Sequence, residues 1–282
     1  MNKAAFAVSL LASNPRLLFK HLICRIKLRW QLPELTNTIT KDINGVLFDF
    51  DLDYAPAIKR MFFDCYEIET VEIMRSVLKA GDTFIDVGAN IGYLSAIGAS
   101  FVGKKGQVHS FEPAPKYFQR LTKMAAANPD YRITVNNCAL GEGRGTAKLD
   151  ITSLPNIGWN TMVPNFMRSE TISESVEVPV YRLDEYIKER RLDKISLIKI
   201  DTEGFEFPVL KGLQRYFENT GYLPVIICEI APSAYPLLGY TLVQLSEYMK
   251  RYDYHAFSLI NTHANVDITS LKQTTNIVFR HC

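Results

Sequence analysis

Short apolar runs alternate with amphipathic segments from residue 68 to the end of the chain, and this alternation constrains the fold more than any other feature. Strands that are buried on both faces have continuous apolar runs, and periodic apolar residues between them predict covering helices. Seven runs are predicted as strands: Thr83–Val87, Val108–Phe111, Ile133–Val135, Leu197–Ile200, Val225–Cys228, Ala256–Ile260 and Ile277–Phe279. This order predicts a Rossmann-like α/β fold, in which helices cover both faces of a mainly parallel seven-stranded sheet.

The first 65 residues carry a different pattern. Residues 16–30 predict an amphipathic helix, because apolar residues recur at every fourth position: Leu18, Leu22, Ile26 and Trp30, with Phe19 and Ile23 beside them. Two predicted strands, Thr38–Ile43 and Val46–Leu52, flank Asn44-Gly45, a dipeptide that favours a tight hairpin turn. We interpret residues 1–65 as a helix-and-hairpin cap on a main domain that covers residues 66–282.

Polar and glycine residues follow the first three strands of the predicted sheet. A turn with Asp86, Gly88, Asn90 and Gly92 ends the first strand, and glycine there lets the backbone approach a ligand closely. Glu112 follows the second strand, where a carboxylate can accept hydrogen bonds from ribose hydroxyls. Asn137 follows the third strand, where it either reaches the adenine edge of a cofactor or closes a turn.

The turn sequence distinguishes between adenosine cofactors. Turns that bind a diphosphate have the pattern Gly-x-Gly-x-x-Gly. Counted from Gly88, Asn90 takes the place of the second glycine and Tyr93 that of the third. Asp86 also brings a carboxylate to the turn, which repels phosphate and suits the ammonium group of a methionine moiety. The residues therefore favour S-adenosylmethionine over NAD.

Four motifs carry a resemblance to a known family. Gly81-Asp82-Thr83-Phe84-Ile85-Asp86-Val87-Gly88-Ala89-Asn90-Ile91-Gly92 comes first, then Phe111-Glu112-Pro113, Asn137-Cys138-Ala139-Leu140 and Ile198-Lys199-Ile200-Asp201-Thr202-Glu203-Gly204-Phe205-Glu206. Together they resemble the FkbM family of methyltransferases, from about Tyr66 to Tyr254. The resemblance implies a class I methyltransferase fold and O-methylation of a hydroxyl on a sugar, glycan or secondary metabolite.

The carboxylates of the last motif are the candidate catalytic groups. Asp201 and Glu203 follow the fourth strand, beside the expected cofactor, where a carboxylate can orient a hydroxyl and take its proton. Asp201 is our first choice and Glu203 the second, and Lys199 can pair with one of them. Both carboxylates could instead only stabilise the start of a helix. Oxygen ligands from Asp201, Glu203, Glu206 and Glu229 would suit Mg²⁺, but their spacing fixes no geometry, so we predict no metal site.

An insertion from about residue 141 to 180 separates the third strand from the fourth. It contains two predicted strands, Thr146–Ile151 and Val176–Tyr181, around a polar loop. The loop carries Trp159, Met162, Phe166 and Met167, which either line a lid over the substrate or pack the insertion down.

Charge and cysteine content bear on partners and compartment. Residues 1–30 contain six basic and no acidic residues, which leaves 26 basic against 30 acidic residues in the remainder. This body gives no reason to expect nucleic-acid binding. The basic helix predicts docking on the domain or, as the alternative, peripheral contact with a membrane. Five scattered cysteines predict neither a disulfide framework nor a zinc site, and hence a reducing, cytoplasmic compartment.

Rival functions remain open from the sequence. The same machinery could methylate a nitrogen on a peptide side chain, so the acceptor is a small molecule, a glycan or a peptide. A scaffold that binds the cofactor without catalysis is a second alternative. A nicotinamide-dependent oxidoreductase is disfavoured by the turn between Gly88 and Tyr93.

Overall fold

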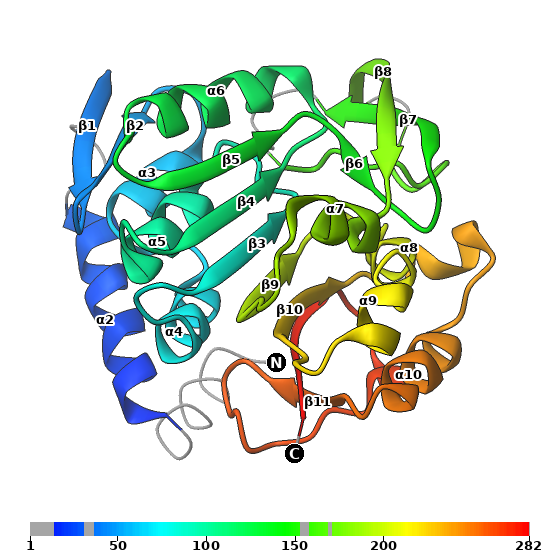
Figure 1. Ribbon diagram of the computed structural model, residues 1–282. Helices are drawn as coiled ribbons and strands as arrows, with labels where there is room; N and C mark the ends of the chain where they lie inside the picture. The colour runs from blue at the N-terminus through cyan, green and yellow to red at the C-terminus, as the bar shows by residue number, and fades with distance from the viewer. Residues whose placement is uncertain (1–13, 31–36, 153–157, 169–170, 282) are drawn as a thin grey trace.

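A seven-stranded sheet forms the centre of the molecule (Figure 1). The computed structural model describes residues 14–30, 37–152, 158–168 and 171–281. The strands, in their order across the sheet, are β11 (His255–Ser258), β12 (Thr275–Arg280), β10 (Val225–Ile230), β9 (Leu197–Ile200), β3 (Thr83–Val87), β4 (Gln107–Phe111) and β5 (Arg132–Asn136). The five strands from β10 to β5 are parallel, and β12 runs antiparallel to both of its neighbours. All seven predicted strands and the mainly parallel sheet are therefore confirmed.

The strand order places a switch point at β3. From β3 the chain goes outward to β4 and β5, and then returns to β9 on the other side of β3. Val87 at the end of β3 is paired with Phe111 of β4 and with Ile200 of β9. The residues that follow these three strands therefore meet at one edge of the sheet, where ligands bind in open α/β folds.

Helices cover both faces of the sheet, because alternate side chains of each strand enter different cores. Phe84 and Leu197 belong to one apolar cluster, and Ile85 and Ile198 belong to the other. The helices of the main domain are α4 (Ile68–Val77), α5 (Tyr93–Val102), α6 (Pro115–Ala126), α7 (Leu183–Arg190), α8 (Glu206–Lys211), α9 (Gln214–Asn219) and α10 (Leu242–Arg251), with 3-10 turns η3 (Tyr235–Leu238) and η4 (Ile268–Ser270).

The helical segment that follows β9 is interrupted. Leu210 and Phe217 have the spacing of one continuous helix, whereas α8 ends at Lys211 and α9 begins at Gln214. Gly212 lies between them so close to the insertion that a Cβ would stand 2.2 Å from the carbonyl oxygen of Gly141. This tertiary contact, which periodicity does not report, explains the glycine at the break.

The N-terminal hairpin packs directly on the main domain. Strands β1 (Thr38–Ile43) and β2 (Val46–Asp51) form the predicted hairpin, with Asn44 and Gly45 both at positive φ. Helix α3 (Pro56–Phe62) follows. The ring of Phe48 contacts Tyr93 of α5 edge-on, with 5.9 Å between centroids. The hairpin therefore shares one of the two apolar cores of the sheet.

Helix α2 (Pro15–Trp30) is docked beside α4 and leaves part of its apolar stripe exposed. Leu17 and Cys24 are buried against the domain. Within the predicted apolar row, Leu18 is half-buried against the same apolar cluster, whereas Phe19 is 64%, Leu22 46% and Ile26 61% exposed. The side chain of Trp30 lies outside the described residues. Docking is thus confirmed, and part of the apolar stripe remains on the surface.

A disulfide joins α2 to the segment after α3, which corrects the expectation of unpaired cysteines. Cys24 and Cys65 are bonded, and their Cα atoms are 5.5 Å apart. They are 41 residues apart in sequence, so only the docking of α2 brings them within bonding distance. Disulfides persist mainly in oxidising compartments, so the inference of a reducing compartment loses its basis.

None of the helices in residues 14–30, 37–152, 158–168 and 171–281 has both the length and the apolar composition that crossing a membrane requires.

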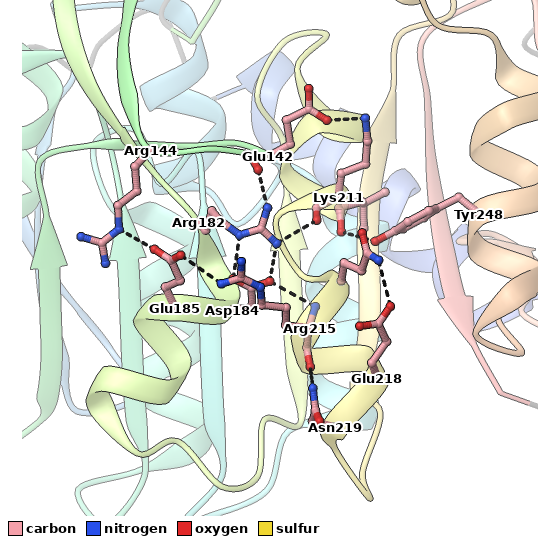
Figure 2. A network of polar contacts seen from close by, with 12 residues as sticks. Glu142, Arg144, Arg182, Asp184, Glu185, Lys211, Arg215, Glu218, Asn219 and Tyr248 are labelled. Carbon is pink, nitrogen blue, oxygen red and sulfur yellow. Dashed lines mark hydrogen bonds and ion pairs between the residues drawn. The ribbon is translucent and has the colours of Figure 1, made fainter.

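The insertion forms a small sheet of β6 (Ala139–Leu140), β8 (Ile172–Tyr181) and β7 (Gly145–Thr152), so both predicted strands are confirmed. A polar network ties it to the helices beneath (Figure 2). Arg182 donates to the carboxylate of Asp184 at 3.0 Å, to the carbonyl oxygen of Lys211 at 3.4 Å and to that of Glu142. Because Asp184 is buried and also accepts from the backbone of Arg215, the insertion is fixed at its base.

Candidate active site

A pocket opens where the carboxyl ends of β3, β4 and β9 meet. Its lining comes from the turn after β3, the residues at the ends of β4, β5 and β9, the insertion, and α3 with the segment before α4. Of the predicted site residues, the pocket brings together Asp86, Gly88, Asn90, Glu112, Asp201 and Glu203. Gly92 and Asn137 are not among the lining residues.

Gly88 is required by a close approach of two backbones. It has a φ of +77°, and a Cβ at this position would stand 1.8 Å from the carbonyl oxygen of Asp201. Asn90 adopts the left-handed conformation at φ 53° without being a glycine, and it lines the pocket. Gly92 has a different role, because a Cβ there would collide with the side chains of Leu121 and Met124 on α6. Its absent side chain allows α5 to begin against α6.

Asp86 places a buried carboxylate at the pocket wall. Its Oδ2 accepts a 2.6 Å hydrogen bond from the hydroxyl of Ser95, which also contacts the hydroxyl of Ser110 at 2.8 Å. The other oxygen, Oδ1, is buried with no partner in the described part of the chain. Burial raises the pKa of Asp86 above its ordinary value. This pocket-lining carboxylate therefore keeps one oxygen without a hydrogen-bond partner among the described residues.

Glu112 holds the glycine turn as well as lining the pocket. Its two oxygens accept hydrogen bonds from the backbone N–H groups of Asn90 and Ala114, each at 2.8 Å. Burial raises the pKa of Glu112 to about 7, although these two hydrogen bonds oppose the shift. A carboxylate has about four acceptor positions, so further donors can still be bound.

Asn137 closes a turn. Its amide donates to the carbonyl oxygen of Glu112 at 2.9 Å and to that of Pro113 at 3.2 Å. Cys138, Ala139 and Leu140 line the pocket after β5 in its place. Of the two roles left open by the sequence, the turn-closing one fits these contacts.

Lys199 and Asp201 form an ion pair at the end of β9, as the sequence suggested. The Nζ atom of Lys199 donates to Oδ2 of Asp201 at 3.0 Å. Burial would lower the pKa of Lys199, but the carboxylates of Asp201, Glu67 and Asp86 outweigh it and hold that pKa well above its ordinary value. Lys199 is therefore a buried cation that is stabilised by electrostatic attraction to three carboxylates.

Glu203 lies on the same loop in a left-handed conformation, with φ at 51°. Burial, together with repulsion from Asp201 and Glu206, raises the pKa of Glu203 to about 8. Its backbone carbonyl accepts a 2.6 Å hydrogen bond from Thr161 of the insertion. The insertion thus holds the loop that carries both candidate catalytic residues.

Three carboxylates converge here. One oxygen each from Asp201, Glu203 and Glu229 lies within 4.8 Å of the others, an arrangement that could hold a metal ion. Burial and repulsion from Asp201 and Glu203 raise the pKa of Glu229 to about 10. The repulsion among these three carboxylates can be relieved in two ways: by a bound metal ion or by protons that the carboxylates share.

Glu206 holds the loop after β9 in place through hydrogen bonds. It is completely buried, and its Oε1 accepts from the N–H of Gly204 at 2.8 Å and from the N–H and hydroxyl of Thr202 at 3.2 and 3.1 Å. Its Oε2 has no hydrogen-bond partner among the described residues, and burial raises its pKa to about 7. The last glutamate of the motif therefore positions the loop and does not line the pocket.

Sequence reasoning missed Tyr66 and Glu67, which line the pocket just before α4. Glu67 has a φ of 46°, unusual for a residue that is not glycine, and its buried Oε2 has no partner within the described ranges. Burial raises its pKa, with a smaller contribution from Asp201 that Lys199 opposes. In the sequence, the only indication that these two residues belong to the site was their position, because the family resemblance begins at Tyr66.

The insertion forms one wall of the pocket. Leu149, Gly158, Asn160 and Met162 line it, whereas Trp159 between them is 56% exposed. Phe166 packs in a small apolar cluster with Val163 and Ala234. Of the four loop residues singled out in the sequence, Met162 reaches the pocket and Phe166 packs the insertion down.

The fold is an open α/β sheet, and its pocket lies at the switch point, where enzymes of this architecture bind their ligands. A family model described as the methyltransferase FkbM domain matches residues 86–256. Since this match covers more than half of the 282 residues, the chain belongs to the FkbM methyltransferase family. The resemblance noted in the sequence is confirmed, and the chain is a methyltransferase.

Three similar proteins are named as methyltransferases. The chain is 29% identical over 188 residues to methyltransferase sdnD of Sordaria araneosa, covering 56% of this chain and 68% of that protein. It is 26% identical over 161 residues to the hexuronic acid methyltransferase AglP of Haloferax volcanii, covering 57% and 62%. It is 30% identical over 183 residues to the 31-O-demethyl-FK506 methyltransferase FkbM of Streptomyces tacrolimicus, covering 55% and 67%.

A solved structure is also similar. The methyltransferase FkbM from Methylobacillus flagellatus is 20% identical with a TM-score of 0.45, covering 74% of this chain and 50% of that chain. The matched region thus spans half of that structure and roughly two thirds of the three named relatives.

Proposed function

We propose that this chain transfers the methyl group of S-adenosylmethionine to a hydroxyl oxygen of a sugar, glycan or secondary metabolite. The observation that carries the proposal is the pairing of Asp201 with buried Lys199 at the edge of the pocket that the glycine turn frames. The names of two relatives support the acceptor class, since one acts on a hexuronic acid and another on a demethylated FK506 oxygen.

Several features of the pocket fit this cofactor. Glu112 would bind the ribose hydroxyls, and the backbone at Gly88 would lie against the cofactor. Asp86 and Glu67 each have a buried carboxylate oxygen without a partner among the described residues, and both line the pocket. Such acceptors suit the ammonium group of a methionine moiety and would repel a diphosphate.

Asp201 would orient the acceptor and take its proton. Bound S-adenosylmethionine supplies a methyl group on a sulfonium, which makes that carbon electrophilic. Lys199 fixes one oxygen of Asp201 through the 3.0 Å contact, which leaves the other oxygen to accept from a hydroxyl. Holding the hydroxyl in line and removing its proton are the two contributions expected from such a group. Glu203 on the same loop would assist.

The test is single-turnover methyl transfer from labelled cofactor across a panel of sugars, glycans, polyketides and peptides. With the accepted substrate, Asp201→Asn should slow transfer by roughly 10²–10⁴-fold, while the cofactor dissociation constant changes little. Glu247→Gln, an exposed carboxylate on α10, is the matched control and should leave the rate unchanged.

Three outcomes would contradict the proposal. A near-normal rate for Asp201→Asn would reduce Asp201 to a structural carboxylate. Methyl transfer to a peptide nitrogen alone would replace the hydroxyl acceptor. Cofactor binding without transfer to any acceptor would favour a non-catalytic scaffold.

A further inference from the structure

The outward face of α2 carries an apolar row that the described residues leave uncovered. Phe19, Leu22 and Ile26 are 64%, 46% and 61% exposed. Their spacing of three and four residues places them on one side of the helix. In Figure 1, α2 runs along the outer flank of the molecule, away from β10 and α10.

Basic side chains accompany this row. Arg16, Arg25 and Arg29 are exposed on the same helix, and residues 1–30 contain no acidic residue. At 100° per residue, Arg25 and Arg29 flank the apolar row on one side and Arg16 flanks it on the other. The outward face of α2 is therefore an apolar strip between cationic edges.

The opposite face of α2 is fixed to the domain. Cys24 is bonded to Cys65, and Lys20 forms an ion pair with Glu72 of α4. Lys27 donates to the carbonyl oxygen of Phe63 at 3.3 Å. Because these contacts hold the helix on one side, the apolar row cannot turn inward while they persist.

We propose that α2 docks this enzyme on the surface of an anionic lipid bilayer. A helix that lies in the interface inserts its apolar strip between the lipid head groups, while arginines along its edges contact lipid phosphates. The charges on α2 favour a membrane over a second copy of the helix as the binding partner. Two copies of α2 would bring their arginines together and repel each other, whereas an anionic membrane attracts the arginines and accommodates the apolar row.

Vesicle co-sedimentation of the full-length protein tests this docking. We expect binding to vesicles of phosphatidylcholine mixed with phosphatidylglycerol, little binding to phosphatidylcholine alone, and weaker binding as salt concentration rises. The double variant Leu22→Ser/Ile26→Ser should reduce partitioning at least tenfold. The control Leu237→Ser/Val243→Ser changes two residues of similar exposure, 46% and 51%, near the far end of the domain, and should bind normally.

The contribution of the α2 arginines to membrane binding is tested with a second pair of variants. Arg25→Glu/Arg29→Glu should abolish binding to the anionic vesicles, whereas Arg132→Glu/Lys188→Glu, which reverses two exposed charges elsewhere, should retain it. Binding of S-adenosylmethionine is measured in every variant to establish that each is folded, and it is independent of the lipid readout.

Three results would overturn the proposal. One is the absence of binding to anionic vesicles, and a second is equal binding by the α2 variants and their controls. The third is self-association that is lost in Leu22→Ser/Ile26→Ser without any vesicle binding, which would make the strip an interface between copies of the chain.

Discussion

Glu206→Gln should remove one contribution to the pH dependence of the stability of the cofactor-free protein. Glu206 is completely buried, and its pKa is raised by burial from 4.5 to about 7. Between these two values the folded state holds a proton that the unfolded state has lost. The free energy of unfolding therefore falls as pH rises through this window. Glutamine stays neutral, so this part of the pH dependence disappears.

The size of the effect follows from the shift. A shift from 4.5 to about 7 corresponds to about 3 kcal/mol of unfolding free energy, fully present below pH 4.5 and lost above about pH 7. The glutamine of the variant would keep the Oε1 acceptor that holds Gly204 and Thr202. At pH 5 the two proteins should therefore have similar stability, and at pH 8 the variant should be more stable by about 3 kcal/mol.

Urea unfolding at equilibrium, followed from pH 5 to pH 8.5, measures this difference. The exposed control Glu247→Gln should follow the wild type at every pH. Parallel curves for wild type and Glu206→Gln would refute the reasoning, since they would mean that Glu206 is not protonated when folded. A variant that is less stable at all pH values would show that the loop needs both carboxylate oxygens.

Three further predictions concern the turn, the cofactor and the disulfide. Glu112→Ala should weaken cofactor binding by about 1.5–3 kcal/mol, measured by calorimetry, and an unchanged dissociation constant would remove Glu112 from the site. Gly88→Ala should lower unfolding free energy by about 1–3 kcal/mol or more and abolish cofactor binding, because its Cβ would stand 1.8 Å from the Asp201 carbonyl oxygen; a stable variant that binds cofactor would contradict this. Cys24→Ser/Cys65→Ser should lower the unfolding free energy by about 4 kcal/mol, given a sequence separation of 41 residues, and unfolding curves that coincide with the wild type would contradict it.

The sheet and the glycine turn could be predicted because their signals are local. A strand buried on both faces needs a short continuous apolar run, as in Leu197–Ile200, and it has that run wherever the rest of the chain goes. The carboxyl ends of parallel strands meet at one edge, so Asp86, Glu112 and Asp201 could be brought together on topology alone.

Residues whose roles depend on packing could not be assigned in this way. Gly92 belongs to the same turn as Gly88, yet one glycine accommodates α6 and the other accommodates the Asp201 backbone. Asn137 follows its strand as expected, but its amide is used by two carbonyl groups. Glu67 has no strand before it, and only the docking of α4 brings it to the pocket.

The orientation of α2 shows a second limit of periodicity. An apolar stripe indicates that a helix has two different faces, but it does not say which of them meets the protein. Here the mixed face of Lys20, Cys24 and Lys27 makes the ion pair, the disulfide and the backbone contact. The same docked face buries Leu17 in an apolar cluster with Phe63 and Ile68, while Phe19, Leu22 and Ile26 remain on the surface.

The charges around Lys199 connect the fold to its chemistry. Burial and mutual repulsion raise the pKa of Glu67, Asp86 and Glu203, with one buried cation among them. Replacing this charged group by apolar residues of similar size would stabilise the folded protein, since buried carboxylates that repel one another lower its stability. A cationic ligand relieves that repulsion, so its binding should release protons and strengthen as pH rises towards 8. The pocket is therefore matched in charge to a sulfonium cofactor, at the expense of the stability of the empty protein.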